Sequence, residues 1–493
     1  MSLTVLSDEV IRNLLEGLTR EEAEDFAHSL KCALHEYSTG TQSIDTSFLH
    51  QPQRTSIYSE TTGTTTLFMP SNSPVGHGIK VVTVTSPHAD PSLPAVKPTG
   101  SLTLYSPEGS PVGFLHAQTL TAFRTALASS CLLTKRATVR TLTVFGSGLQ
   151  AYWHVRLALM LRGHTIRAVN IINRRFSDNA KNILKRFYAV PAEMKQREGW
   201  EQAQFSVLTP GYGEYSRLQK EHIREADVIY CCTPSTEELF EASILTSREG
   251  RKKGRLIVAI GSYTKHMREL PTELLLQAVK PHHSGHLHYH KHATEGGVIV
   301  VDTLDGALKE AGEIIDTRLE PKQLVELGEL VMIHRLAQEE EDSLASQSST
   351  NGSSISGSFE NLDIASSNSA MSTVFGSGAS NDSCSKRSTS LSPSRARRGS
   401  GASGSIGSQN GGGSGFHMPS LRHHKRTASQ GSSAGDRDRE RQKRDDHLAR
   451  WLTSGNIIYK SVGLGLMDLV VGLEVVKLAN AKGVGSHIEN FSS

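Results

Sequence analysis

A glycine-rich stretch, Gly146-Ser147-Gly148-Leu149-Gln150-Ala151, has residue types that suit phosphate binding. It directly follows the β-prone run Leu142–Phe145 and opens an apolar helical stretch. Gly148 has no side chain to block a pyrophosphate, the helix directs free N–H groups at it, and Ala151 allows close helix–strand packing. The order of strand, glycines and helix favours a dinucleotide site over the alternative, an ordinary strand-to-helix turn.

The end of the next predicted strand indicates which dinucleotide is bound. Sites for NAD usually carry an acidic residue there to hold the ribose hydroxyls. This chain has Asn173-Arg174-Arg175 instead, and two guanidinium groups suit a 2′-phosphate. The sequence therefore favours NADP(H) over NAD(H). The alternative is that both arginines are solvated surface residues.

Two further segments follow predicted strands and are expected to border the same ligand. Thr233-Pro234-Ser235 follows the strand that begins near Ala226, and Ala259-Ile260-Gly261-Ser262 ends another. Ligands of open α/β sheets gather at the carboxyl ends of the strands. We therefore expect Thr233, Ile260 and Ser262 to contact the cofactor.

A histidine-rich stretch at residues 282–292 raises the possibility of a metal site. His286, His288 and His290 alternate and would share one face of a strand. No cysteine or acidic cluster accompanies them, and a polar histidine-rich loop is the more common reading. We therefore predict no metal.

The elements that must position these residues change in character along the chain. Two amphipathic helices are predicted from Ser7, the second opened by the capping-box pair Thr19 and Glu22. Short β-prone runs between residues 56 and 114 predict a mostly antiparallel sheet. From Thr121 onward, helices alternate with strands, which predicts βαβ units and a parallel sheet.

Residues 338–447 consist largely of Ser, Gly and charged residues, and apolar periodicity resumes after them. Such a composition buries too little to offset the entropy of ordering, so we predict a long disordered insertion. The strings KRSTS, RRGS and KRTAS within it suit basophilic kinases, because basic residues precede the hydroxyl. The alternative is a solvated spacer in which these strings are incidental.

The bulk composition points to a soluble intracellular, cytoplasmic protein. The hydrophobic fraction is 37% and the net charge is +3 over 493 residues, which gives no reason to expect nucleic acid or a membrane surface as partner. No apolar run approaches the roughly 20 residues that span a bilayer. The five cysteines are odd in number, without metal-ligand spacing, and fit a reducing compartment.

Several motifs in order resemble the ornithine cyclodeaminase/mu-crystallin family. They are FRTALASS, VFGSGLQA, NRR, ADVIYCCTPSTEELF, IGSYTKHMREL, VVDTLDGALKEAGE and YKSVGLGLMDLVVGLEVVKLA. The resemblance implies a Rossmann-type NAD(P)-binding domain inserted in an α+β domain that binds substrate and forms a homodimer. The expected division is substrate domain 1–122, Rossmann domain 123–302, return to the substrate domain at 303–337, insertion 338–447, and substrate domain again at 448–493.

The resemblance also assigns residues by motif. Arg54 in QPQRT and Lys80 in IKVVT match the family's basic pair for the substrate carboxylate, a role that suits the guanidinium fork of an arginine. Val462 matches a substrate-lining position. The positions that match cofactor-contacting ones are Arg124, Leu149, Gln150, Thr233 and Ser461.

One departure from the family pattern concerns chemistry. Tyr263 stands where the family's cyclodeaminases carry an aspartate that handles ammonia loss. Tyrosine is a poor base, with an ordinary pKa of about 10, but it can donate a proton. We therefore expect a reductase of a small cyclic imino acid, of the pyrroline- or piperideine-2-carboxylate type, with Lys80 and Tyr263 as catalytic candidates. The alternatives are ornithine cyclodeamination and a low-turnover NADPH-dependent binding protein.

Overall fold

A computed structural model describes most of the chain outside the long Ser/Gly-rich region. The described residues are 2–40, 49–86, 89–90, 92–94, 96–280, 296–330 and 451–491. The predicted disordered insertion with its kinase-type strings, and His286, His288 and His290, lie outside these ranges.

The first sheet has seven strands and is mostly antiparallel, as predicted. Its order is β15-β1-β6-β5-β4-β3-β2, and only β1 and β6 pair in parallel. The strands are β1 (Leu3–Leu6), β2 (Thr55–Ser59), β3 (Thr64–Ser73), β4 (Gly76–Thr85), β5 (Thr99–Tyr105), β6 (Pro111–His116) and β15 (Ser486–Ile488).

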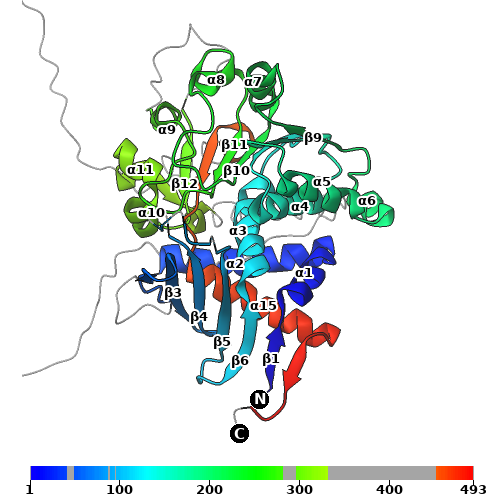
Figure 1. Cartoon of the computed structure of the whole chain (residues 1–493), viewed down its shortest axis with the longest axis vertical. Helices are drawn as coiled ribbons and strands as arrows, with labels where there is room; N and C mark the ends of the chain where they lie inside the picture. The colour runs from blue at the N-terminus through cyan, green and yellow to red at the C-terminus, as the bar shows by residue number, and fades with distance from the viewer. Residues whose placement is uncertain are drawn as a thin grey trace, which may run out of the picture. The chain divides into compact units, whose positions relative to one another are not determined.

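Helices from the N-terminal and C-terminal parts of the chain cover this sheet, as Figure 1 shows. The helices α1 (Asp8–Glu16), α3 (Ala117–Leu133) and α15 (Gly465–Lys482) contact its strands, and α2 (Arg20–Thr39) packs on α15 and α3. The predicted capping box is present, because Thr19 and Glu22 each bond the backbone N–H of the other. β4 places Gly78 and Lys80 on its inner face, so the lysine side chain is buried between the sheet and its helices.

The second sheet has eight strands, and every pair is parallel. Its order is β13-β12-β14-β11-β10-β7-β8-β9. The strands are β7 (Thr141–Phe145), β8 (Ala168–Ile172), β9 (Gln204–Leu208), β10 (Val228–Cys231), β11 (Leu256–Ala259), β12 (Val298–Val301), β13 (Leu324–Glu326) and β14 (Ile457–Lys460). The strand order reverses between β7 and β10, and in such sheets ligands bind beyond the carboxyl ends at this switch point.

Both faces of the central strands of the second sheet are covered, so β10 and β11 are buried at every position. Val228 and Tyr230 of β10 join the core that holds Trp153, whereas Ile229 and Cys231 join a separate core. The covering elements are α4 (Leu149–Arg162), α5 (Asp178–Ala189), α6 (Ala192–Glu198), α7 (Tyr215–Glu225), α8 (Ser243–Thr246), η1 (Gly250–Lys252), α9 (Thr272–Ala278), α10 (Leu304–Glu310), α11 (Gly312–Thr317) and η2 (Pro321–Gln323).

Two strands and one helix lie differently from the division of the chain expected from the sequence. β13 and β14, which lie in stretches assigned to the substrate domain, are strands of the second sheet. The boundary at residue 122 falls inside α3, which packs against both α15 and α4. The physical reason is that β14 is buried on both faces between β11 and β12, a pairing between segments far apart in sequence.

Two kinds of feature are absent from the described residues. None of the helices in these ranges is both long and apolar enough to cross a bilayer. The same ranges hold no group of three or more His, Cys, Asp or Glu side chains placed to bind a metal ion.

Candidate active site

The predicted glycine cradle has the geometry of a phosphate site. Gly146 adopts φ +103°, and a Cβ there would lie 2.9 Å from the Cys232 carbonyl, so only glycine fits. Around Gly148, by contrast, a Cβ would meet no atom within 4 Å, and this residue begins α4 with no side-chain cap. Gln150 Oε1 is buried with no hydrogen-bond partner among the described residues. An open cradle, an uncapped helix and an orphan polar atom together fit a bound dinucleotide.

The loops that follow β10 and β11 are tied together by one buried carboxylate. Glu269 accepts hydrogen bonds from the backbone N–H groups of Thr233 at 2.8 Å, Gly261 at 2.7 Å and Ser262 at 3.2 Å. It also accepts one from Thr233 Oγ1 at 3.1 Å. Burial raises the pKa of Glu269, while Lys460 and the backbone donors oppose that rise.

Ser262 is held in place by a second buried cluster, which consists of Glu313 and Lys460. Its hydroxyl donates to Glu313 Oε1 at 2.5 Å, and Lys460 Nζ contacts both the Ser262 hydroxyl and its carbonyl. Lys460 Nζ also lies 3.3 Å from Glu313 Oε2. Each of the three side chains is at most 3% exposed. Ser262 is therefore a buried, fixed support of this loop, because its side chain and both of its backbone groups are hydrogen-bonded.

The turn that follows β14 is organised by Asp302. This fully buried carboxylate accepts from Ser461 Oγ at 2.9 Å, Val462 N at 2.9 Å and Gly463 N at 2.6 Å. Gly463 adopts φ +87°, and a Cβ there would lie 2.8 Å from Arg124 Nη2. The turn of the second sheet therefore packs directly on the guanidinium of Arg124, which comes from α3.

Arg124 and Lys80 share one buried acidic partner. Lys80 Nζ lies 2.5 Å from Asp468 Oδ2, and Arg124 Nε lies 3.0 Å from Asp468 Oδ1. The three residues come from β4, α3 and α15, and all are buried. Two cations with one carboxylate leave an excess of positive charge. Burial lowers the pKa of Lys80 to about 8, with Arg124 and Arg54 adding to this effect and Asp468 opposing it.

Arg54, which precedes β2 of the first sheet, contacts α10 and the loop that follows β11 of the second sheet. Its Nε lies 2.8 Å from Glu310 Oε1, its Nη2 bonds Glu310 Oε2, and Nη2 also donates to the Tyr263 carbonyl at 3.4 Å. Burial lowers the pKa of Arg54 and raises that of the Tyr263 phenol. The positive charge of Arg54 counteracts the rise at Tyr263. Tyr263 is therefore protonated at neutral pH and available as a donor.

At the end of β8, the two predicted 2′-phosphate ligands are exposed. Asn173 Nδ2 donates to the Arg175 carbonyl at 2.8 Å and so fixes the turn. Arg174 and Arg175 both face solvent. Their exposure fits either a charged cofactor group or simple solvation.

The structure therefore brings most of the predicted residues to one end of the second sheet. Arg124 meets the turn at Ser461–Gly463, and Arg54 meets Tyr263. Sequence reasoning missed the charged residues that hold them, namely Glu269, Asp302, Glu310, Glu313, Lys460 and Asp468. Their signal was a charge inside an otherwise apolar motif, as in LMDLVV and VIVVDT.

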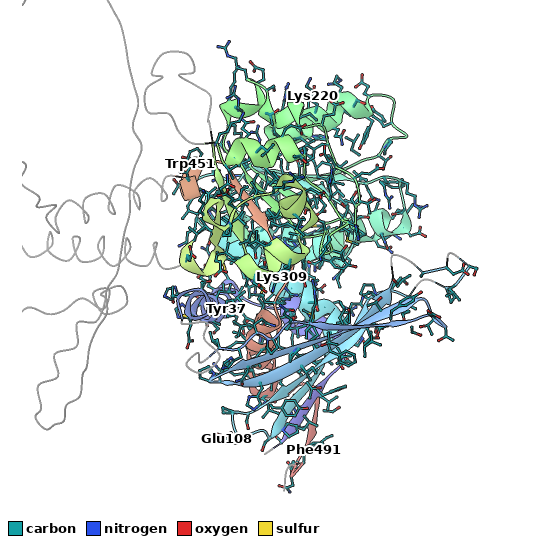
Figure 2. All side chains as sticks on the ribbon, turned by 90° about the vertical axis from the view of Figure 1, so that its left-hand side faces the viewer. Tyr37, Glu108, Lys220, Lys309, Trp451 and Phe491 are labelled. Atoms are coloured by element: carbon teal, nitrogen blue, oxygen red, sulfur yellow. The ribbon has the colours of Figure 1, made fainter. Side chains whose placement is uncertain are left out.

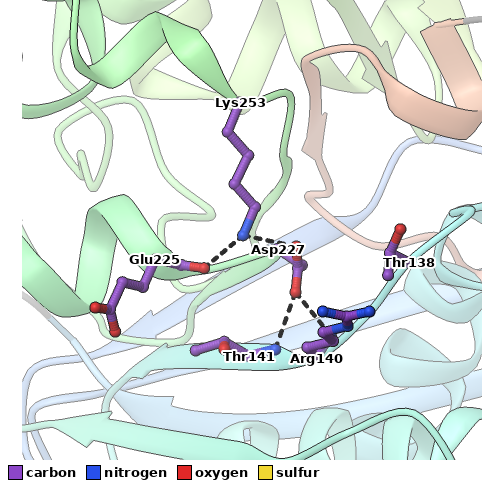
Figure 3. A pocket seen from close by; sticks show the side chains of 6 residues that line it. All are labelled: Thr138, Arg140, Thr141, Glu225, Asp227 and Lys253. Atoms are coloured by element: carbon purple, nitrogen blue, oxygen red, sulfur yellow. Dashed lines mark hydrogen bonds and ion pairs between the residues drawn. The ribbon is translucent and has the colours of Figure 1, made fainter.

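A separate hollow lies at the opposite, amino-terminal ends of β7 and β10, as Figure 3 shows. Asp227 accepts from the backbone N–H of Arg140 at 2.7 Å and of Thr141 at 3.0 Å. Lys253 pairs with the same carboxylate at 2.7 Å. These bonds join strand starts to one another, so we interpret this hollow as structural.

The fold and the site define a two-sheet protein in which a parallel dinucleotide-type sheet faces a cluster of buried cations. Residues 10–208 match the family model described as ornithine cyclodeaminase/mu-crystallin family. This match agrees with the resemblance that the motifs indicated.

Three individual proteins are similar to the chain. An uncharacterized protein of Saccharomyces cerevisiae is 30% identical over 243 residues, which are 44% of this chain and 59% of the yeast protein. Thermococcus litoralis Δ1-pyrroline-2-carboxylate reductase, solved with NADH and L-proline, has a TM-score of 0.55 at 18% identity, covering 99% of this chain and 100% of the other. An archaeal alanine dehydrogenase dimer with bound NAD has a TM-score of 0.54 at 17% identity, covering 100% of both chains. At these identities the two structures establish the fold, and the predicted fold class is confirmed.

Proposed function

We propose that the protein is an NAD(P)H-dependent reductase of a small cyclic imino acid. Hydride would add to the α-carbon of the C=N bond and one proton to the nitrogen, giving the cyclic amino acid. The observation that carries this proposal is the excess of buried positive charge formed by Lys80, Arg124 and Asp468, with Arg54 close enough to lower the pKa of Lys80. Such a site suits a small carboxylate.

Different residues would bind the substrate, donate the proton and position the two sheets. Arg54 and Lys80 bind the substrate carboxylate, and Val462 borders the ring. Lys80 or Tyr263 supplies the proton, because one is a lysine with a pKa of about 8 and the other a protonated phenol. Arg124 is held by Asp468 and packs on Gly463. It thereby fixes the distance between the substrate-binding residues and the turn at Ser461.

The cofactor-binding residues would be those of the second sheet's carboxyl edge. Gly146, Gly148, Leu149 and Gln150 would hold the pyrophosphate, and Thr233, Ile260 and Ser262 would border the nicotinamide. A bound nicotinamide supplies the hydride. Asn173, Arg174 and Arg175 favour NADPH, because no carboxylate stands there to hold the ribose hydroxyls.

We also propose a cytoplasmic homodimer. Ile57 of β2 and Phe114 of β6 are 56% and 44% exposed on the first sheet. Apolar side chains on an antiparallel sheet are a common basis for association between two copies. Sedimentation of the wild type against Phe114→Asp tests this proposal, and a monomeric wild type would refute it.

One assay separates the reductase from its rivals. The purified chain is mixed with NADPH or NADH and a panel of cyclic ketimine carboxylates, and in parallel with ornithine. Imine-dependent loss of the reduced-nicotinamide absorbance supports the proposal. Proline and ammonia formed from ornithine would establish cyclodeamination instead, and tight NADPH binding without turnover would establish a binding protein.

A further inference from the structure

The guanidinium assigned to the substrate carboxylate already binds a carboxylate of this chain. Arg54 immediately precedes β2, and Glu310 is the last residue of α10. The pair has two bonds, Nε to Oε1 at 2.8 Å and Nη2 to Oε2. The side chains are 19% and 31% exposed, so neither is sealed in the core. Figure 2 labels the preceding residue, Lys309, on the same helix.

A guanidinium fork holds one carboxylate in this two-bond geometry, so substrate and Glu310 compete for it. A substrate that takes Arg54 leaves Glu310 half-buried without its partner. Leaving a charge there costs free energy unless a new cation arrives. The next cation along α10, Lys309, already pairs with Asp305 at 2.7 Å. The substrate itself is then the natural source of the replacement charge.

We infer that Glu310 selects ligands that carry a cationic nitrogen next to their carboxylate. The carboxylate displaces Glu310 from Arg54, and the released Glu310 pairs with the ring nitrogen once it has taken the proton, or with the ring amine of the product. This exchange also offsets the repulsion that a cationic ligand meets from Lys80 and Arg124. Keto acids and carbocyclic acids offer no such charge and are discriminated against. The inference rests on the proposed function, because it takes Arg54 as the carboxylate site.

Two ligands that differ in one ring atom test this role. L-Proline carries a ring NH2⁺, whereas (S)-tetrahydrofuran-2-carboxylate has an oxygen there and the same carboxylate. Both are titrated calorimetrically into full-length protein saturated with NADPH, for the wild type, Glu310→Gln and Glu273→Gln. Glu273 is the matched control, because it is an exposed carboxylate on α9 and its replacement leaves the pair of Lys309 with Asp305 intact.

The wild type is expected to prefer L-proline by about tenfold or more, the effect of one partly buried ion pair. In Glu310→Gln the oxygen analogue should bind more tightly than in the wild type, and the preference should fall toward one. Glu273→Gln should retain the wild-type ratio. Glu310→Asp, which keeps the charge, should restore part of the preference.

The outcomes that contradict the inference are distinct from those that contradict the proposed function. An unchanged ratio in Glu310→Gln, with both ligands still binding, refutes the role of Glu310 and leaves the reductase proposal intact. Failure of both ligands to bind the wild type, with no effect of Arg54→Ala on any imino acid, refutes the carboxylate site itself.

Discussion

Lys80 and Asp468 form an ion pair that lies inside the first layer of the protein, with Nζ 2.5 Å from Oδ2 and side-chain exposures of 3% and 0%. The pair links β4 to α15, and the strands of the second sheet lie between these two elements in the sequence. Arg124 completes it at 3.0 Å. Lys80 is both the lysine proposed to bind the substrate and a buried residue of the fold. Its ionisation therefore affects both activity and stability.

Activity is predicted to fall as the pH rises through about 8, because Lys80 then loses the charge that binds the carboxylate. The folded pKa lies below the ordinary 10.5, so between these values the unfolded chain binds more protons. The contribution of Lys80 to the free energy of unfolding therefore rises over the range in which activity falls. A kcat/KM profile measured beside urea unfolding checks this. Loss of both together would instead indicate simple alkaline unfolding.

Asp468→Asn is predicted to destabilise the protein by about 3–5 kcal/mol, because it leaves two buried cations without their carboxylate. Glu474→Gln on the same helix is the control. Glu474 is 27% exposed and pairs with Lys477 at 3.6 Å, so its loss should cost less than about 1 kcal/mol. Equal urea midpoints for the two variants would show that the Asp468 cluster is not a stabilising unit.

The layers of the fold follow from local sequence patterns, but part of the strand order does not. Four-residue runs such as Val228–Cys231 read as buried strands from their composition alone. Ile457–Tyr459 is also apolar, yet the neighbours of β14, which are β11 and β12, lie far away in sequence. Pairing between distant segments depends on the whole sheet, so local sequence patterns do not identify the neighbours of β14.

The sequence predicts the site residues whose local motif indicates a function. It does not predict the residues whose role is to hold another side chain in place. Gly146 and Gly148 follow a strand and precede a helix, which gives their role directly. Asp468 and Glu269 lie within apolar motifs, and their partners come from distant segments. Burial marks such a charge as paired, but the sequence does not identify its partner.

Gly148→Ala is predicted to weaken cofactor binding by about tenfold or more while leaving the thermal midpoint unchanged. A methyl group here meets no protein atom within 4 Å, so it would enter only the space assigned to the pyrophosphate. Gly213→Ala is the matched control, since that glycine also has open surroundings. Titration of NADPH by fluorescence gives the result. Unaltered NADPH affinity in Gly148→Ala would place the phosphates elsewhere.

The double variant Arg174→Ala, Arg175→Ala is predicted to raise the KM for NADPH by about tenfold to a hundredfold and to leave that for NADH nearly unchanged. Only NADPH carries the 2′-phosphate that two guanidinium groups would bind. Lys185→Ala, an exposed cation on the helix that follows, controls for a general change in surface charge. If both cofactors are affected alike, the arginines are not the selectivity determinant.

Glu269→Gln is predicted to raise the KM for the nicotinamide cofactor more than it lowers kcat. The glutamate receives backbone N–H bonds from Thr233, Gly261 and Ser262, and glutamine offers one acceptor oxygen and turns an NH2 group toward a donor. The loops after β10 and β11 would then separate, although no reacting group is removed. Glu273→Gln, an exposed carboxylate on α9, is the control. A variant that loses stability but keeps the wild-type cofactor KM would show that Glu269 supports the fold without positioning the cofactor.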